Sequence, residues 1–120
     1  MSSTEANRLL EERTLAFAVS IVHFVAGFAR SDASGVVGRQ LLKSGTSIGA
    51  NYREANRAES RDDFIHKTAI VLKEAAESDY WLELCVRTDF GDVVQREALC
   101  REARELLAIF TTINRRAKGR

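Results

Sequence analysis

The sequence contains no proline in its 120 residues, and this absence constrains the fold more than any other feature. Proline removes a backbone donor and kinks or breaks a helix, so no helix in this chain is forced to end. Toward the C-terminus, apolar residues follow alternating steps of four and three, the spacing of one buried helical stripe. These residues are Leu99, Ala103, Leu106, Phe110 and Ile113. The sequence therefore predicts long helices and an all-α fold.

Turn and capping signals divide the chain into four helices. Ser60, followed three residues later by Asp63, resembles a capping box at the start of the third helix. The segments SDASG (31–35) and TDFGD (88–92) predict turns. The helices are expected at about residues 4–29, 36–58, 61–87 and 93–116. Short connections favour antiparallel neighbours, so we predict one domain, 1–120, folded as an up-down-up-down antiparallel four-helix bundle.

Composition is that of an ordinary soluble domain, with 29% charged residues, 45% hydrophobic residues and a net charge of +1. A charge so near zero gives the whole molecule no electrostatic bias toward nucleic acid or a membrane. Cys85 and Cys100 are the only cysteines and do not form a CxxC pair. That usage suits a reducing compartment, so we expect a cytoplasmic protein.

The run LAFAVSIVHFVAGFA, residues 15–29, is the most apolar part of the chain. It is shorter than the ~20 residues that span a bilayer, and it contains His23, so we interpret it as a core helix and expect no membrane partner. Its apolar residues cover most of the helix circumference. A helix of that kind must be covered nearly all round, and in so small a protein we expect another subunit to supply part of the cover.

The stretch LLKSGTSIGANYREANRAES, residues 41–60, is rich in residues that form helices poorly. On a helical wheel it separates into three faces. The first follows the core spacing: Leu41, Ser44, Ile48, Asn51, Ala55 and Ala58. The second gathers small residues beside an aromatic one: Gly38, Gly45, Gly49 and Tyr52. The third is a basic stripe: Arg39, Lys43, Arg53, Arg57 and Arg61.

The glycines of this stretch do not form a phosphate-binding loop. Neither GxxxxGK[ST] nor GxGxxG is present, and no strand precedes them. Glycines on one helical face instead allow another helix to approach closely, which must offset a cost of roughly 1 kcal/mol per glycine. Ser44, Ser47, Asn51 and Glu54 are expected to join a polar network or to pair with a neighbouring helix. We predict a packing or interface role for this face.

The third predicted helix has a core side and a second side. The core side contains Phe64, Val71, Leu72, Ala75, Leu82 and Val86. The second side carries Ile70, Trp81 and Cys85 among Lys67, Glu74 and Glu77. The size of Trp81 favours a subunit contact over exposed surface. Residues 39–61 hold five basic and two acidic residues, whereas residues 62–89 hold three basic and seven acidic ones. Such complementary helices could pair within a subunit or between subunits.

The segments SGTSIGANYREANRAESRDDFIHK (44–67) and LKEAAESDYWLEL (72–84) resemble a bacterial family of four-helix-bundle proteins, first noticed in intervening sequences of 23S ribosomal RNA genes. The matching residues are Ser44, Ser47, Ile48, Asn51, Glu54, Ser60, Phe64, Ile65, Lys73, Glu74, Glu77, Tyr80, Trp81 and Leu82. The resemblance implies a ring-like homopentamer and no known catalytic activity. The accessory proteins of diversity-generating retroelements are related, basic, and thought to bind nucleic acid; the near-neutral charge here departs from them.

No combination of residues predicts an enzyme, a cofactor or a metal. No Glu has a His three residues later, as a di-iron bundle requires, and Asp62 with His66 supplies at most half a metal site. The cysteines fit buried small apolar residues, and His23 fits a core or interface histidine. Glu54, Glu74 and Glu77 could serve as paired acids, but no nucleophile accompanies them, and structural ion pairs explain them better.

Two functions remain. The first is a non-catalytic homo-oligomeric module that docks an unidentified protein partner. The second is an accessory factor that binds RNA or DNA through the basic stripe and a basic tail, which contains Arg115, Arg116, Lys118 and Arg120. The opposing interpretation of the stripe is that its cations pair with acidic residues of the third helix. We prefer that interpretation, and with it the first function.

Overall fold

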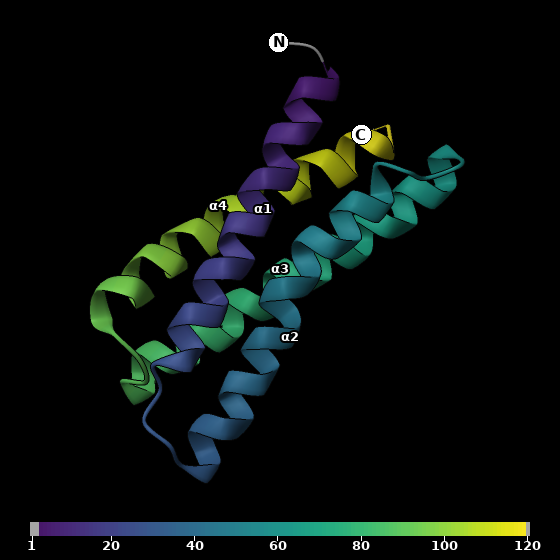
Figure 1. The fold of residues 1–120 in the computed structure, drawn as a ribbon. Coiled ribbons are helices and arrows are strands. Elements are labelled where there is room, and N and C mark those ends of the chain that lie inside the picture. The colour runs from purple at the N-terminus through teal and green to yellow at the C-terminus, as the bar shows by residue number, and fades with distance from the viewer. Residues whose placement is uncertain (1–2, 120) are drawn as a thin grey trace.

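The computed structural model describes residues 3–119, which form four α-helices (Figure 1). They are α1 (Ser3–Ala26), α2 (Asp32–Ala55), α3 (Arg61–Thr88) and α4 (Val93–Ala117). No strand occurs among the described residues. The predicted all-α class and the number of helices are confirmed.

The helices follow one another around a four-sided bundle. Each helix packs against the next in the chain, and α1 also packs against α4. Within residues 3–119 the backbones of the diagonal pairs α1–α3 and α2–α4 stay apart, although the rings of Tyr52 in α2 and Phe110 in α4 meet across the core, with 5.1 Å between centroids. The start of α1 and the end of α4 lie toward the same end of the molecule (Figure 1). The packing is that of an up-down bundle, with overall dimensions of 44 × 25 × 21 Å.

Three helix boundaries differ from the prediction by three or four residues, and a side-chain cap explains the first of them. The segment expected as a turn begins α2: the hydroxyl of Ser31 accepts a hydrogen bond from the Ser34 amide at 3.0 Å, and the Ser31 amide donates to the Ser34 hydroxyl at 3.0 Å. This reciprocal capping box satisfies two donors and fixes the helix start. α1 ends three residues early, at Ala26, because Gly27 already bonds three residues back, to the Phe24 carbonyl. α2 ends at Ala55, also three residues early.

The start of α3 agrees with the prediction. The hydroxyl of Ser60 accepts a hydrogen bond from the amide of Asp63 at 3.1 Å, as an N-cap does. In a capping box the carboxylate of Asp63 would accept a hydrogen bond from the amide of Ser60. Here it accepts from the amide of Glu59, one residue earlier, at 3.4 Å.

The core lies along the bundle axis and contains the stripe predicted in α4. Of that stripe, Leu99, Ala103, Leu106 and Phe110 are buried, and Ile113 is half-buried. In α3 the prediction was wrong by one position: Cys85 is fully buried, whereas Val86 is 44% exposed. Over a helix of 28 residues, the buried line follows Val71, Leu82 and Cys85, and an ideal wheel misplaces its last turn.

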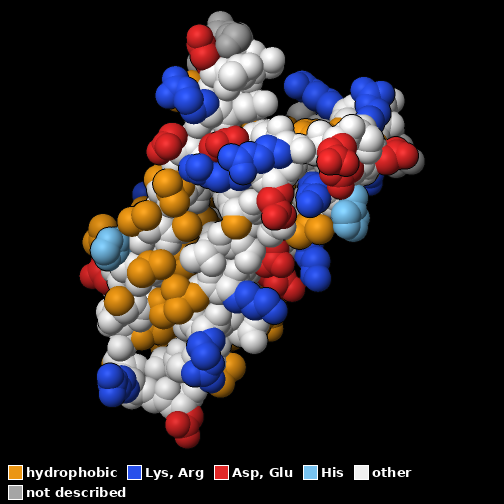
Figure 2. All heavy atoms as spheres, turned by 45° about the vertical axis from the view of Figure 1, so that its right-hand side comes forward, with side chains coloured by type: hydrophobic (Ala, Val, Ile, Leu, Met, Phe, Trp, Pro, Cys, Tyr) orange, Lys and Arg blue, Asp and Glu red, His pale blue; other side chains and the backbone are white. Residues whose placement is uncertain are grey.

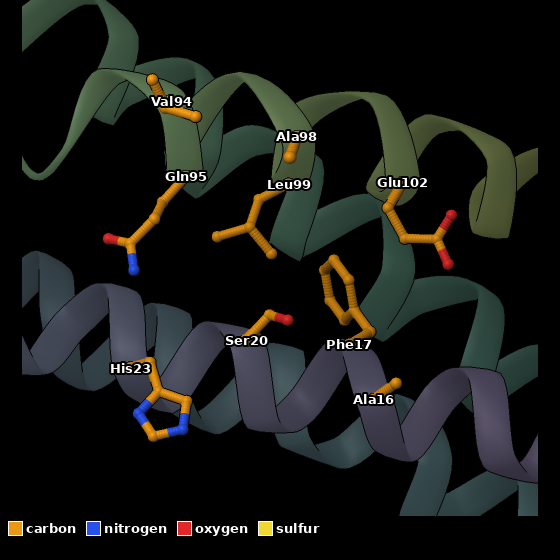
Figure 3. A pocket seen from close by; sticks show the side chains of 9 residues that line it. All are labelled: Ala16, Phe17, Ser20, His23, Val94, Gln95, Ala98, Leu99 and Glu102. Atoms are coloured by element: carbon orange, nitrogen blue, oxygen red, sulfur yellow. The ribbon is translucent and has the colours of Figure 1, made fainter.

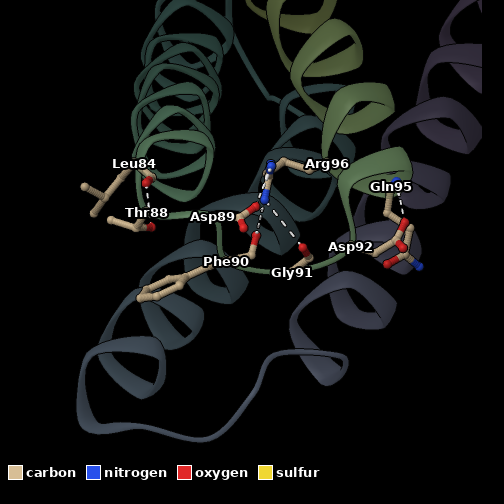
Figure 4. Close-up of polar contacts among 8 residues, drawn as sticks. All are labelled: Leu84, Thr88, Asp89, Phe90, Gly91, Asp92, Gln95 and Arg96. Atoms are coloured by element: carbon tan, nitrogen blue, oxygen red, sulfur yellow. Dashed lines mark hydrogen bonds and ion pairs between the residues drawn. The ribbon is translucent and has the colours of Figure 1, made fainter.

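The turn between α3 and α4 is fixed by a buried arginine (Figure 4). The guanidinium of Arg96 donates to the carbonyls of Phe90 at 3.0 Å and Gly91 at 3.4 Å, and it pairs with Asp89 at 3.1 Å. Asp89 and Gly91 both have positive φ, 55° and 81°. Gly91 also lies against the ring of Phe24, so the turn is held to the end of α1.

Candidate interaction surfaces

The glycine face of α2 packs against α1 of the same chain. A Cβ at Gly45 would lie 2.9 Å from a methylene carbon of Ile21, and one at Gly49 would lie 2.9 Å from the hydroxyl of Thr14. Gly38 lies equally close to Val25. Real Cβ atoms do not approach other atoms so closely, so these glycines set the distance between the two helices.

The polar side chains of α2 were expected to join one network or to pair with a neighbouring helix, and Ser44 and Glu54 both contact residues of α3. Ser44 is buried, and its hydroxyl lies 3.0 Å from that of Ser78 in α3. Asn51 is only half-buried and donates to the carbonyl of Ser47, one turn earlier, at 2.9 Å. Glu54 is exposed. The expectation of a core position for Asn51 was wrong, because the side of α2 that faces the core runs through Ile48, Tyr52 and Ala55.

Ser78 is the contact residue that the sequence analysis missed. It is completely buried, and its hydroxyl donates to the carbonyl of Glu74 at 2.9 Å as well as meeting Ser44. A signal was present: Ser78 lies three residues after Ala75 and four before Leu82, both on the buried line of α3. A polar residue at such a position requires a buried partner.

The outward side of α1 exposes three large apolar residues. Leu15, Val19 and Val22 are 46%, 48% and 46% exposed. They border a groove of about 450 Å³ between α1 and α2, and Thr46 and Ala50 line it from α2. Figure 2 shows hydrophobic side chains gathered in one area of the surface, with Lys and Arg around it. We use the name α1–α2 groove for this groove together with Leu15, Val19 and Val22. It is the part of α1, the helix predicted to be apolar nearly all round, that the rest of the subunit leaves uncovered.

A second groove, of about 540 Å³, separates α1 from α4 (Figure 3). His23 and Glu102 lie at opposite ends of it, and Phe17 and Leu99 point into the space between the helices. The carboxylate of Glu102 is engaged by Arg13, at 2.6 and 2.7 Å. Within the described residues no hydrogen bond links His23 to a hydroxyl or a carboxylate, so the groove lacks the nucleophile–base arrangement that covalent catalysis uses.

The second side of α3 carries an aromatic pair beside carboxylates. Tyr80 is 61% exposed and its ring meets that of half-buried Trp81 edge-on, with 5.0 Å between centroids. Glu77 precedes them by about one turn and Glu74 by about two turns. One carboxylate oxygen of Glu74 is buried without a hydrogen-bond partner. Burial raises the pKa of Glu74, and the charge of Glu77 raises it further, while Lys73 and Lys43 lower it. We call this set the α3 ridge.

The predicted basic stripe is interrupted and largely unpaired. Arg39 and Lys43 lie ten or more residues before Arg53, a separation of about 15 Å along a helix. Within residues 3–119, Arg53 is the only stripe member in an ion pair, 4.0 Å from Glu11 of α1. The stripe therefore does not pair with acids of α3. In the ion pair that joins α2 and α3, the cation belongs to α3 and the anion to α2: Lys67 lies 3.7 Å from Glu54. The prediction had placed the cations on α2.

The basic tail lies at the end of α4. Arg115, Arg116 and Lys118 are exposed and form no ion pair within residues 3–119. Arg57 and Arg61 are also unpaired, and antiparallel packing brings their connection between α2 and α3 to the same end of the bundle (Figure 1). Acidic residues stand among them, including Glu59 and Asp62. Arg120 lies outside the described residues.

Neither metal nor thiol chemistry has a site in the part of the chain that the structure describes. No group of three or more His, Cys, Asp or Glu side chains gathers there as metal ligands do. Burial raises the pKa of the Cys85 thiol to about 11 and also raises the pKa of Cys100. A thiolate is the reactive form, so both thiols are poor nucleophiles at neutral pH. Across residues 3–119, every helix is too short or too polar to cross a bilayer.

Comparisons with known proteins agree with this architecture. The chain superposes with a TM-score of 0.81 on the crystal structure of a protein of unknown function from the S23 ribosomal protein family of Bacteroides thetaiotaomicron VPI-5482. The two are 40% identical, and the similarity covers 91% of this chain and 97% of the other. A search of curated proteins found no match. The sequence model of the 23S rRNA-intervening sequence proteins matches residues 10–112. This chain therefore belongs to the 23S rRNA-intervening sequence protein family.

Proposed function

We propose that the protein is a non-catalytic, homo-oligomeric interaction module, assembled as a small ring of about five copies. The observation that supports this function is the α1–α2 groove. Leu15, Val19 and Val22 are each nearly half exposed on one helix, and contiguous apolar surface of this kind marks an interaction site on a soluble protein. The module is proposed to act in the cytoplasm, as its two free cysteines suit, and to dock a further protein partner once assembled.

The absence of catalysis in this proposal follows from the chemistry of the grooves. The groove between α1 and α4 separates His23 from Glu102, and Glu102 is neutralised by Arg13. The orphan oxygen of Glu74 belongs to the α3 ridge, where no hydroxyl or thiol is available for it to activate within hydrogen-bonding distance. Acid–base catalysis needs such a contact with a reacting group.

Molar mass in solution tests the assembly. One chain weighs 13.4 kDa, so light scattering coupled to size exclusion should give several times that mass, about five times for a pentamer. The mass should persist on dilution into the low micromolar range. A mass of one chain at all concentrations would contradict the proposal.

Nucleic-acid binding is the second candidate function. It is favoured by the unpaired Arg115, Arg116 and Lys118 at the same end of the bundle as Arg57 and Arg61. Fluorescence anisotropy with labelled RNA and DNA should detect binding at low salt that weakens steeply as salt rises, because phosphate contacts release counterions. Neutralising the tail with three glutamines should abolish it, whereas neutralising Arg39 should not. Absence of binding at low salt would exclude this function.

A further inference from the structure

We propose that the α3 ridge of one copy fills the α1–α2 groove of the next copy, which makes the contact head-to-tail. This inference rests on the proposed homo-oligomer and deepens it by naming the two surfaces that meet. The occupant of the groove is thus a second copy of this chain.

The groove has the shape and chemistry to receive an aromatic side chain. Its α1 wall consists of Leu15, Val19 and Val22. Its α2 wall is low at Thr46, Gly49 and Ala50, and Arg53 lines the groove one turn further along α2. An apolar recess with a low wall is the kind of pocket that a tryptophan anchor occupies at protein interfaces.

The α3 ridge presents such an anchor. Trp81 and Tyr80 stand edge-on to each other, and Tyr80 is 61% exposed. Trp and Tyr supply large, rigid contact area at interfaces. Because Glu74 lies seven residues before Trp81, the two share one side of α3, and the buried, unpartnered oxygen of Glu74 is a polar atom that lacks a donor within the subunit.

The charges beside the two surfaces are opposite in sign. Arg39, Thr46 and Arg53 are spaced by seven residues and therefore lie along one face of α2. Thr46 and Arg53 line the groove, and Arg39 lies two turns before Thr46 on the same face. Arg39 makes no ion pair in the described part of the chain, and Arg53 makes one long contact of 4.0 Å. Glu74 and Glu77 stand on the ridge beside one exposed cation, Lys73, so the ridge is negative on balance. Positive groups on one surface and negative ones on the other favour their docking and disfavour contact of either surface with itself.

The position of the two surfaces determines what kind of assembly forms. The groove lies between α1 and α2. Ser78 lies four residues after Glu74 and three before Trp81, and its hydroxyl meets that of Ser44 in α2 at 3.0 Å, which places the ridge on the α2–α3 side. These are neighbouring sides of a four-sided bundle, roughly a right angle apart. A head-to-tail contact generates a ring where its rotation closes, and a turn of this size suits a small ring such as the proposed homo-oligomer. The outer face of α2, with Lys43, would then line the inside of the ring.

A complementation experiment tests the contact. Val19→Glu places a charge in the groove and leaves the ridge intact, whereas Trp81→Ala removes the anchor and leaves the groove intact. Each variant alone should have the mass of one chain, 13.4 kDa. Mixed in equal amounts, the two should form a two-chain species, because the ridge of the first still fits the groove of the second.

Controls keep the result interpretable. Val94→Glu introduces the same charge at a 75% exposed valine of α4, outside both surfaces, and should keep the wild-type mass. Glu77→Lys reverses the charge of an exposed ridge residue, so it should leave the fold intact. If Trp81→Ala weakens assembly by disrupting the contact, Glu77→Lys should weaken assembly as well. Circular dichroism should show a helical fold in all four variants.

The outcomes separate the two proposals. A wild-type protein of one-chain mass would contradict the homo-oligomer itself. A wild-type oligomer that keeps its mass in Trp81→Ala and Glu77→Lys would overturn the head-to-tail contact alone. Monomeric variants that fail to combine when mixed would also overturn it, since a contact of one surface with itself would behave in that way.

Discussion

The two sides of α1 are packed in different ways. On the side of α2, Gly45 and Gly49 bring the backbones so close that a single added carbon would overlap Ile21 or Thr14. On the side of α4, a groove of about 540 Å³ runs between the helices. There the contact is made at the ends, by the ion pair of Arg13 with Glu102 and by Phe24 against Gly91.

This difference shows how a small bundle distributes its close contacts. Backbones approach only where side chains are absent, so the α1–α2 contact depends on the glycines of one helix. The α1–α4 contact has no glycine in either helix and relies on one turn and on Arg13, which pairs with Glu102 and Glu105. The glycines also carry no side chain that could fill the space beside α1. The feature that lets the two backbones approach each other therefore also leaves the α1–α2 groove open. Substitutions on each side of α1 test this difference in packing.

The largest effect is expected at the end of the α1–α4 contact, for Gly91→Ala. The φ of Gly91 is 81°, and a Cβ there would lie 2.3 Å from a ring carbon of Phe24. Left-handed backbone costs a residue with a Cβ about 1–2 kcal/mol, and overpacking adds roughly 1–3 kcal/mol. Urea unfolding should show a loss of about 2–5 kcal/mol.

The matched control for Gly91 is Gly119→Ala. Gly119 has nearly the same φ, 78°, but nothing lies within 4 Å of its added Cβ. Its cost should be no more than about 1 kcal/mol, because the last residues of a helix fray. Equal losses at the two positions would mean that Phe24 yields to the new methyl group, and that the turn does not hold α1 to α4.

A smaller effect is expected for Gly49→Ala in the α1–α2 contact. Alanine gains roughly 1 kcal/mol in helix propensity, but its Cβ would lie 2.9 Å from the hydroxyl of Thr14 and 3.3 Å from the Thr14 backbone. That hydroxyl cannot move freely, because it donates to the Glu11 carbonyl at 2.9 Å. Overpacking of about 1–3 kcal/mol should offset or exceed the propensity gain, and urea unfolding should show a net loss of up to about 2 kcal/mol.

Gly35→Ala in the same helix is the control for Gly49, and its effect should have the opposite sign. Only the flexible end of Arg39 comes near its added Cβ, at 3.4 Å. Propensity then dominates, and the variant should be more stable than wild type by about 0.5–1 kcal/mol. A stabilising Gly49→Ala would show that α1 can move away from α2, which would refute the close contact.

The fold was predictable because its signals are local. A chain without proline, with stripes at helical spacing and two short turns, leaves few alternatives to a bundle. The helix ends were less predictable: Ser31 and Ser34 looked like turn residues, and only their reciprocal hydrogen bonds make them a helix start. The prediction buried Val86, whereas the structure buries Cys85 in its place, because a wheel drawn at an ideal angle accumulates error along a long helix.

The contacts of the candidate surfaces were predictable only in part. A wheel identifies the glycine face of α2, but it cannot say which helix covers it, and the structure shows that α1 of the same chain does. Likewise, the charges of α2 and α3 predicted attraction, yet Lys67 and Glu54 pair with the polarity reversed. Which side chains meet depends on the distances between helices, and these follow from three-dimensional packing.

The smallest effect is expected in the open groove, for Ala98→Leu. Ala98 lies on α4 and lines the groove opposite Ala16 and Ser20 (Figure 3), so a larger side chain meets no close neighbour and can cover apolar surface of α1. Partial burial of the added carbons, at about 0.8 kcal/mol for each one fully buried, should leave stability unchanged or raise it by up to about 1 kcal/mol. Ala108→Leu, at an exposed position of α4 outside the groove, should change it by less than about 0.5 kcal/mol. A loss of more than about 1 kcal/mol for Ala98→Leu alone, measured by urea unfolding, would mean that α1 and α4 are packed as closely as α1 and α2.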